Sequence, residues 1–186
     1  MRKLAPLCAM LCAAALPLLL GACSSTPAKE ETNYATVSSN QFIASNYKAA
    51  DTLLSQLSGK LMADKPLIMA TVVNIDALEQ TTTLGRLVSE QISTRLSQGN
   101  LSMVEMKLRT SVYLKRGQGE LMLTREIGQV AQQHNAQAIV VGSYAETSDM
   151  VFVNVKVIQP NTNLVLAAHD YALAKEGIVR SMLMQH

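Results

Sequence analysis

The sequence has no tryptophan, only two phenylalanines in 186 residues, and almost no excess of charge. Its formal net charge is +2, and two of its cations, Arg2 and Lys3, stand at the N-terminus, which leaves 14 basic residues against 14 acidic ones. Nucleic-acid-binding domains carry a concentrated positive surface, and proteins that bind single strands add aromatic side chains on which bases stack. The composition therefore argues against a nucleic-acid partner.

Cysteine is also scarce, with three residues at Cys8, Cys12 and Cys23. The first two lie in an uncharged, mainly apolar run, residues 4–22, that follows the basic start of the chain. A basic start, an apolar run and small residues before a cleavage site are typical of a secretory signal. Removal of the signal would leave Cys23 as the only cysteine, and an intramolecular disulfide is then excluded.

The stretch "LGAC", residues 20–23, resembles the lipobox of bacterial lipoproteins, whose cysteine thiol is joined to diacylglycerol and becomes the new N-terminus. In such proteins an aspartate after the cysteine favours the inner membrane, and here the residue is Ser24. The resemblance implies a lipoprotein signal peptide at residues 1–22, lipid attachment at Cys23, and sorting through Ser24 to the outer membrane, with the domain facing the periplasm. The alternatives are plain secretion and an uncleaved anchor. The anchor is an alternative because the apolar run is long enough to cross a bilayer.

Residues 23–41 are small and polar and show no hydrophobic periodicity, which predicts a flexible tether. The rest of the chain, residues 42–186, is long enough for one domain with a sizeable core. Apolar spacing predicts helices at residues 46–65, 81–100 and 124–135. Apolar or alternating runs predict strands at residues 66–76, 101–106, 136–147, 150–159 and 164–173. A short helix is expected after Lys175.

This order of elements, α-β-α-β-α-β-β-β with a short C-terminal helix, predicts an α/β fold in which a mixed sheet is packed with helices. The last two strands are expected to form a hairpin around "PNTN", residues 160–163. Alternation in the first of them places Val151, Val153, Val155 and Val157 on one face of the sheet.

Signals for catalysis and metal binding are weak. The three histidines lack the spacing to other ligands that a metal site needs, and the adjacent His169 and Asp170 point to opposite faces of a strand. Ser143 lacks the second glycine of a nucleophile elbow, and "RGQGE", residues 116–120, lacks the rest of a phosphate-binding fingerprint. We therefore expect no enzyme activity, metal or cofactor; the enzymatic alternative is a hydrolase that uses His169.

Four basic residues lie close together in the least regular stretch of the domain and form a candidate partner surface: Lys107, Arg109, Lys115 and Arg116. Such a run is ordinarily a solvated face. The alternative is an anionic partner, which includes the peptidoglycan of the cell wall.

Three segments follow the lipobox in order: "ATVVNIDALEQTTTLGRLVSEQISTRLSQGN", "VEMKLR" and "AQAIVVGSYA". They resemble the FlgO family of flagellum-associated outer-membrane lipoproteins over about residues 42–173. A looser likeness extends to the curli-secretion lipoprotein, to penicillin-binding-protein activators and to the N-terminal domain of TolB. The resemblance implies a non-enzymatic periplasmic domain that binds flagellar or other envelope proteins and supports flagellar assembly, stability or motility. The alternative is an envelope adaptor that regulates cell-wall synthesis or secretion.

Within this likeness the block "TLGR", residues 83–86, has a structural explanation. Thr82 or Thr83 is expected to cap the helix that begins there. Gly85 would let two backbone segments approach closely, and Arg86 would be exposed or paired with Glu90 one turn later.

Overall fold

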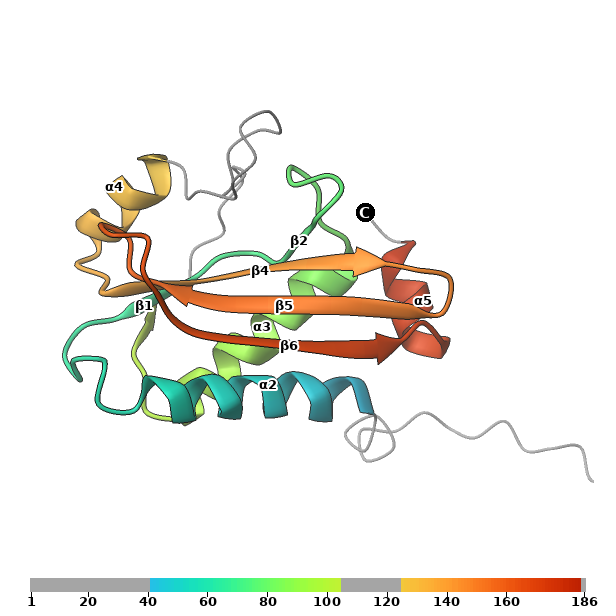
Figure 1. Ribbon diagram of the computed structural model, residues 1–186, viewed down its shortest axis with the longest axis horizontal. Helices are drawn as coiled ribbons and strands as arrows, with labels where there is room; N and C mark the ends of the chain where they lie inside the picture. The colour runs from blue at the N-terminus through green and yellow to red at the C-terminus, as the bar shows by residue number, and fades with distance from the viewer. Residues whose placement is uncertain (1–40, 105–124, 185–186) are drawn as a thin grey trace, which may run out of the picture. The chain divides into compact units, whose positions relative to one another are not determined.

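The computed structural model describes residues 41–104 and 125–184, which belong to one compact unit with a mixed α/β fold (Figure 1). The elements follow one another as α2 (Gln41–Leu57), β1 (Leu67–Met69), β2 (Val73–Asn74), α3 (Thr83–Gln98), β3 (Met103–Val104), α4 (Arg125–Gln133), β4 (Ala138–Glu146), β5 (Met150–Ile158), β6 (Val165–Ala174) and α5 (Gly177–Leu183). This order confirms the predicted fold class and the short C-terminal helix.

All six strands join one sheet, in the order β3-β1-β4-β5-β6, and β2 pairs with β4 farther along. The three short strands β1, β2 and β3 pair in parallel, whereas β4, β5 and β6 form an antiparallel meander. The predicted hairpin is thus confirmed, with a register irregularity between Val157 and Ile158. The meander places β6 at one edge of the sheet.

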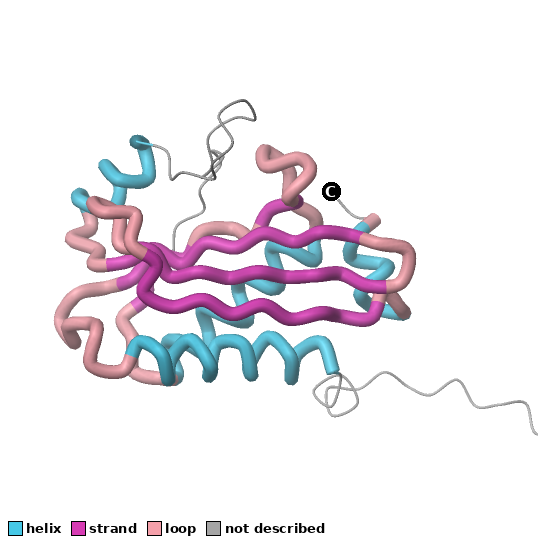
Figure 2. Tube along the Cα trace, in the orientation of Figure 1, coloured by secondary structure: helices cyan, strands magenta, loops and turns pink. Residues whose placement is uncertain are grey.

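The two faces of the sheet are covered unequally. The larger core lies on one face, where α2, α3 and α5 pack against the strands; in Figure 2 the helix α3 passes behind the three long strands. On the other face a smaller cluster joins Ile127 and Ala131 of α4 to Ile139 and Val141 of β4. The four valines of β5 are all buried in the larger core, as their alternation predicts.

Helix α2 begins and ends earlier than its apolar stripe predicts, at Gln41 and Leu57 rather than at residues 46 and 65. Gly59, two residues after the helix, has a φ of +74°, a left-handed conformation that a helix cannot continue through. The turn that follows is held by the side chain of Gln137, which accepts a hydrogen bond from Met62 N–H at 2.7 Å and donates one to Met62 O at 2.8 Å. A partner 75 residues away therefore stabilises the turn that follows the helix.

The apolar run at residues 66–76 is two strands rather than one. Met69 pairs with Val140, and Val73 pairs with Ser143, so three residues on this side stand opposite two residues of β4. The extra residue acts as a β-bulge and reverses the alternation of side chains after it. As a result Val72 faces the larger core and Val73 faces the smaller one.

The first turn of α3 packs directly on this interruption. A Cβ added at Gly85 would overlap the carbonyl oxygen of Val72 and the hydroxyl of Thr81, which confirms the expected close approach. Thr82 stands at the N-cap position, but its hydroxyl forms no capping bond; it shares a hydrogen bond of 3.0 Å with the Tyr144 hydroxyl. The Arg86 guanidinium donates to the Thr83 hydroxyl at 3.0 Å.

We expect Gly85→Ala to lower the free energy of unfolding by about 1–3 kcal/mol, because the new methyl group must displace buried backbone. Gly128→Ala is the matched control: a Cβ there meets nothing within 4 Å, and alanine in the interior of α4 should add up to about 1 kcal/mol. Urea unfolding followed by circular dichroism measures both changes. Equal stability of Gly85→Ala and the wild type would contradict the packing described here.

Candidate functional site

The residues for which the sequence predicts membrane attachment and partner binding lie outside the described part of the chain. These are Cys23, Ser24, Lys107, Arg109, Lys115 and Arg116. They stay predictions. Among the described residues, no helix is both long and apolar enough to cross a membrane.

The residues weighed for catalysis are described, and they are not brought together. His169 is half-buried on β6 and stacks on Tyr171 of the same strand, with ring centroids 6.1 Å apart. Asp170 is exposed and, as its neighbour along the strand, points to the opposite face. Ser143 is buried in the middle of β4, opposite Asn154, and not at a turn from a strand into a helix. None of these geometries brings a nucleophile and a base together.

A polar network inside the larger core connects two helices to the sheet. The Tyr171 hydroxyl donates to Asn46 Oδ1, and the Asn46 amide donates to Gln91 Oε1 at 2.7 Å. Asn46 is fully buried, so these bonds satisfy groups that would otherwise be costly to bury. Burial also raises the pKa of Tyr171 far above its ordinary value. The network joins α2, α3 and β6, and we interpret its role as structural.

Two hollows of about 300 Å³ each lie on the described surface. The first lies between the start of α2, the end of β6 and α5, and Glu176 is the only ionisable residue among its described lining residues. The second lies beside the end of α4 and the β5–β6 turn, and Lys65 is the only ionisable one among its described lining residues. The described lining of neither hollow therefore contains an acid–base pair, and the described residues contain no group of three or more potential metal ligands.

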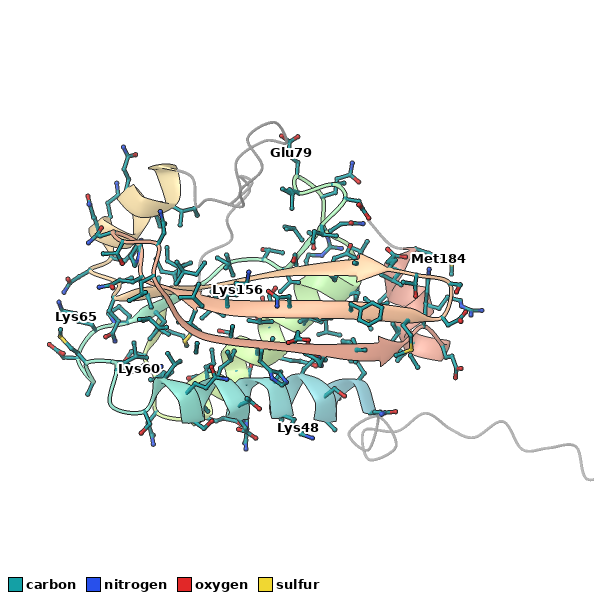
Figure 3. The ribbon with its side chains drawn as sticks, viewed as in Figure 1. Lys48, Lys60, Lys65, Glu79, Lys156 and Met184 are labelled. Carbon is teal, nitrogen blue, oxygen red and sulfur yellow. The ribbon has the colours of Figure 1, made fainter. Side chains whose placement is uncertain are left out.

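The face of the sheet opposite α2 and α3 is partly open over β5 and β6. Phe152 is 52% exposed there, and its cross-strand neighbours are Ala145 and Ala172. Asn154 and Lys156 follow on the same face of β5, and Figure 3 views this face with Lys156 labelled. Phe152 is thus a single exposed aromatic side chain among small and polar ones, which is ordinary for a protein surface.

Two side chains beside α2 bind the free edge of β6, and the apolar pattern of the sequence missed them. The Gln56 amide donates to Ala168 O at 3.0 Å and accepts from Ala168 N–H at 3.1 Å, as a neighbouring strand would. Lys60 Nζ donates to Leu166 O at 2.8 Å. Their four-residue spacing marks one side of a helix, but nothing in the sequence indicates a sheet edge as the partner.

Comparison with known proteins adds a family and a fold. The family model for FlgO protein matches residues 47–178. No curated protein matches the chain. The LpoB C-terminal domain from Escherichia coli is similar with 11% identity and a TM-score of 0.52, covering 72% of this chain and 98% of that one.

Two further solved structures are similar at lower scores. The LpoB C-terminal domain from Salmonella enterica has 15% identity and a TM-score of 0.49, covering 69% of this chain and 97% of that one. Lipoprotein GNA1162 from Neisseria meningitidis has 11% identity and a TM-score of 0.40, covering 61% and 81%. At these identities the likeness of solved structures extends to the fold alone.

The buried tyrosines should make the protein less stable in alkali. An unfolded tyrosine ionises near pH 10, whereas burial raises the pKa of Tyr171 and of Tyr144 in the folded protein. Above about pH 10 the unfolded chain loses protons that the folded chain keeps, so the free energy of unfolding falls as the pH rises. Below that pH the contribution is fully present.

Urea unfolding between about pH 8 and pH 11 measures this slope. We expect Tyr171→Phe to flatten it, even though the variant is less stable at neutral pH because Asn46 loses its donor. An unchanged slope in a Tyr144→Phe, Tyr171→Phe double variant would contradict the explanation.

Proposed function

The chain belongs to the FlgO family, and from this premise we propose that it is an outer-membrane lipoprotein whose periplasmic domain binds envelope proteins and supports the flagellum. The observation that carries the proposal is the extent of the family match, residues 47–178, which runs from α2 through the whole sheet into α5. The lipobox-like "LGAC" at residues 20–23 supports the anchored location.

The proposed mechanism is tethering without catalysis. A lipid on Cys23 would confine the domain to the periplasmic surface of the outer membrane and raise its effective concentration near partners fixed there. A single acyl chain binds a membrane only marginally, whereas the several chains of a mature lipoprotein end anchor firmly. The four basic residues of the 107–116 stretch are a proposed surface for an anionic partner such as peptidoglycan.

The second candidate is an envelope adaptor that regulates cell-wall synthesis or secretion. The looser likeness of the sequence to penicillin-binding-protein activators favours it. In-cell crosslinking of the lipidated protein separates the two candidates. Flagellar ring proteins among the products would support the first, and a murein synthase or a secretion complex would support the second.

Deletion of the gene should reduce swimming through soft agar, because the proposed function supports assembly or stability of the flagellum. Expression of the wild-type protein should restore swimming. The His169→Ala variant should restore it equally, since no step of the proposed function uses the imidazole. A deletion strain that swims normally and carries normal flagella would contradict the flagellar function, and failure of His169→Ala alone would favour the hydrolase alternative.

Cys23→Ala should abolish incorporation of labelled palmitate and release the protein from the outer-membrane fraction, because the thiol is the proposed site of acylation. Ser24→Asp should keep the label but move the protein to the inner membrane, whereas Ser24→Ala should change neither property. Fractionation of the three variants beside the wild type measures both. Continued outer-membrane fractionation of Cys23→Ala, with no label on the wild type, would overturn the anchor.

A further inference from the structure

Strand β6 is an edge of the sheet, and alternate residues point their backbone N–H and C=O groups away from it. Ala168 is one of them, because both of its backbone groups bond to Gln56 rather than to β5. In an antiparallel pair this orientation recurs every second residue, so Asp170, Ala172 and Ala174 also point outward. Lys175 fits the same alternation, since its N–H bonds across to Asp149 O at 2.7 Å.

Side chains from α2 and the turn after it cover only the first half of this edge. Lys60 and Gln56 bond to Leu166 and Ala168, as described above. Figure 1 shows α2 alongside β6, and Figure 3 labels Lys48 within this helix and Lys60 just past its C-terminal end. Among the described residues, no hydrogen bond reaches the outward groups of Asp170, Ala172 or Ala174.

The spacing of side chains along α2 explains why only the first half of the β6 edge is covered. Four residues of helix advance by about 6 Å, and two residues of strand by about 6.8 Å. Because α2 and β6 run in opposite directions, this spacing brings Thr52, four residues before Gln56, level with Asp170, and Lys48 level with Ala172. The Thr52 hydroxyl is short and donates to Lys48 O of its own helix at 2.9 Å, so it leaves the edge open.

The open half of the edge borders the first hollow described above. Ala172 and Ala174 stand at its rim, and Phe42, Leu173 and Val179 supply its apolar lining. A strand added beside β6 would direct alternate side chains to opposite faces. One set would enter this hollow, and the other would lie next to Ala172 on the face where Phe152 is exposed.

We propose that the edge of β6 from Asp170 to Ala174 docks an extended peptide segment of a partner protein. The proposal rests on the proposed function as a protein-interaction domain and identifies its surface. Outward N–H and C=O groups at alternate residues are complementary to the backbone of one extended chain, and strand addition of this kind is a common mode of peptide recognition. The apolar lining of the hollow calls for apolar side chains at alternate positions of the segment.

The charges beside the open edge restrict the sequence of the peptide segment that can bind there. Asp170 and Glu176 are exposed at the two ends of the open edge. The third nearby carboxylate, Glu146, is already paired with Lys175 at 3.1 Å. Lys48 of α2 is also exposed, near Ala172 and between the first two carboxylates. The segment that fits this edge therefore alternates apolar residues and carries a basic residue opposite Asp170 and an acidic one opposite Lys48, since complementary charge favours encounter and register.

The test is binding of short peptides to the full-length protein in detergent micelles. A phage-displayed library of random twelve-residue peptides is selected on the wild type, and the enriched peptides are synthesised for fluorescence anisotropy. Ala172→Pro removes one outward N–H, which is not used by β5, and should weaken binding about tenfold. The matched variant Ala172→Val keeps that N–H and should bind within about threefold of the wild type.

A second pair of variants acts from the helix and leaves β6 unaltered. Thr52→Gln places an amide near Asp170, as Gln56 is placed at Ala168, and should weaken peptide binding while the protein stays folded. Thr52→Val adds no amide and should bind as the wild type does. Shifts of the backbone amide resonances of residues 170–174 on titration should locate the peptide.

Four results would overturn the proposal. The first two are the absence of any enriched peptide and equal binding to Ala172→Pro. The third is self-association of the wild type in sedimentation that Ala172→Pro abolishes, which would assign the edge to a second copy. The fourth is binding that appears only after deletion of residues 24–40, which would assign the edge to the chain's own tether. Because peptide binding is measured without flagella, its failure beside a swimming defect on deletion would leave the proposed function standing.

Discussion

The position of the Val72 backbone between α3 and β4 is the constraint on which the fold depends. Its N–H donates to Ser89 Oγ at 2.8 Å, and its C=O accepts from the Thr81 hydroxyl at 2.7 Å. Val72 is fully buried at a place where the strand is interrupted, so neither group has the sheet partner of a regular strand. Leaving one of them unpaired would cost about 1–3 kcal/mol. Two glycines make the approach possible: Gly85 on the helix, and Gly142 on β4, where a Cβ would stand 2.8 Å from Val72 Cγ2.

This arrangement also determines where α3 begins and which side chains reach each core. The extra residue between β1 and β2 shifts the alternation, so that the strand can supply Leu67 and Val72 to one face and Ile68 and Val73 to the other. Past the bulge, Ile75 N–H reaches Tyr144 O at 2.9 Å and brings the chain back beside β4. The Tyr144 hydroxyl can then bond to the Thr82 hydroxyl, which ties the start of α3 to β4.

Local periodicity predicts the parts of this fold that depend on burial alone. The stripe of α3 and the alternation of Val151 to Val157 in β5 are each visible in a short window of sequence, and the element order follows from them. Three other features depend instead on partners 17, 75 and 112 residues away: the bulge at Val72, the turn at Met62 after α2, and the covered part of the β6 edge at Ala168. No local pattern encodes such pairings. Cys23 and Ser24 lie outside the described residues, so for them the sequence remains the only argument.

The unequal cover of the two faces of the sheet relates the fold to its proposed role. Three helices on one face provide the larger core, and the meander is then stable with its second face and outer edge only partly covered. Because an open edge invites association with any extended chain, its exposure is ordinarily limited by plugs, charges or a covering element. Gln56 and Lys60 form hydrogen bonds with the outward backbone groups of one half of the β6 edge. Asp170 and a hollow lined by Phe42 border the other half. The open part of the edge is too short to pair with a long strand. It still offers the outward backbone groups of three residues to a short extended peptide. A domain confined to a membrane surface can use such a contact, since local concentration compensates for a small binding interface.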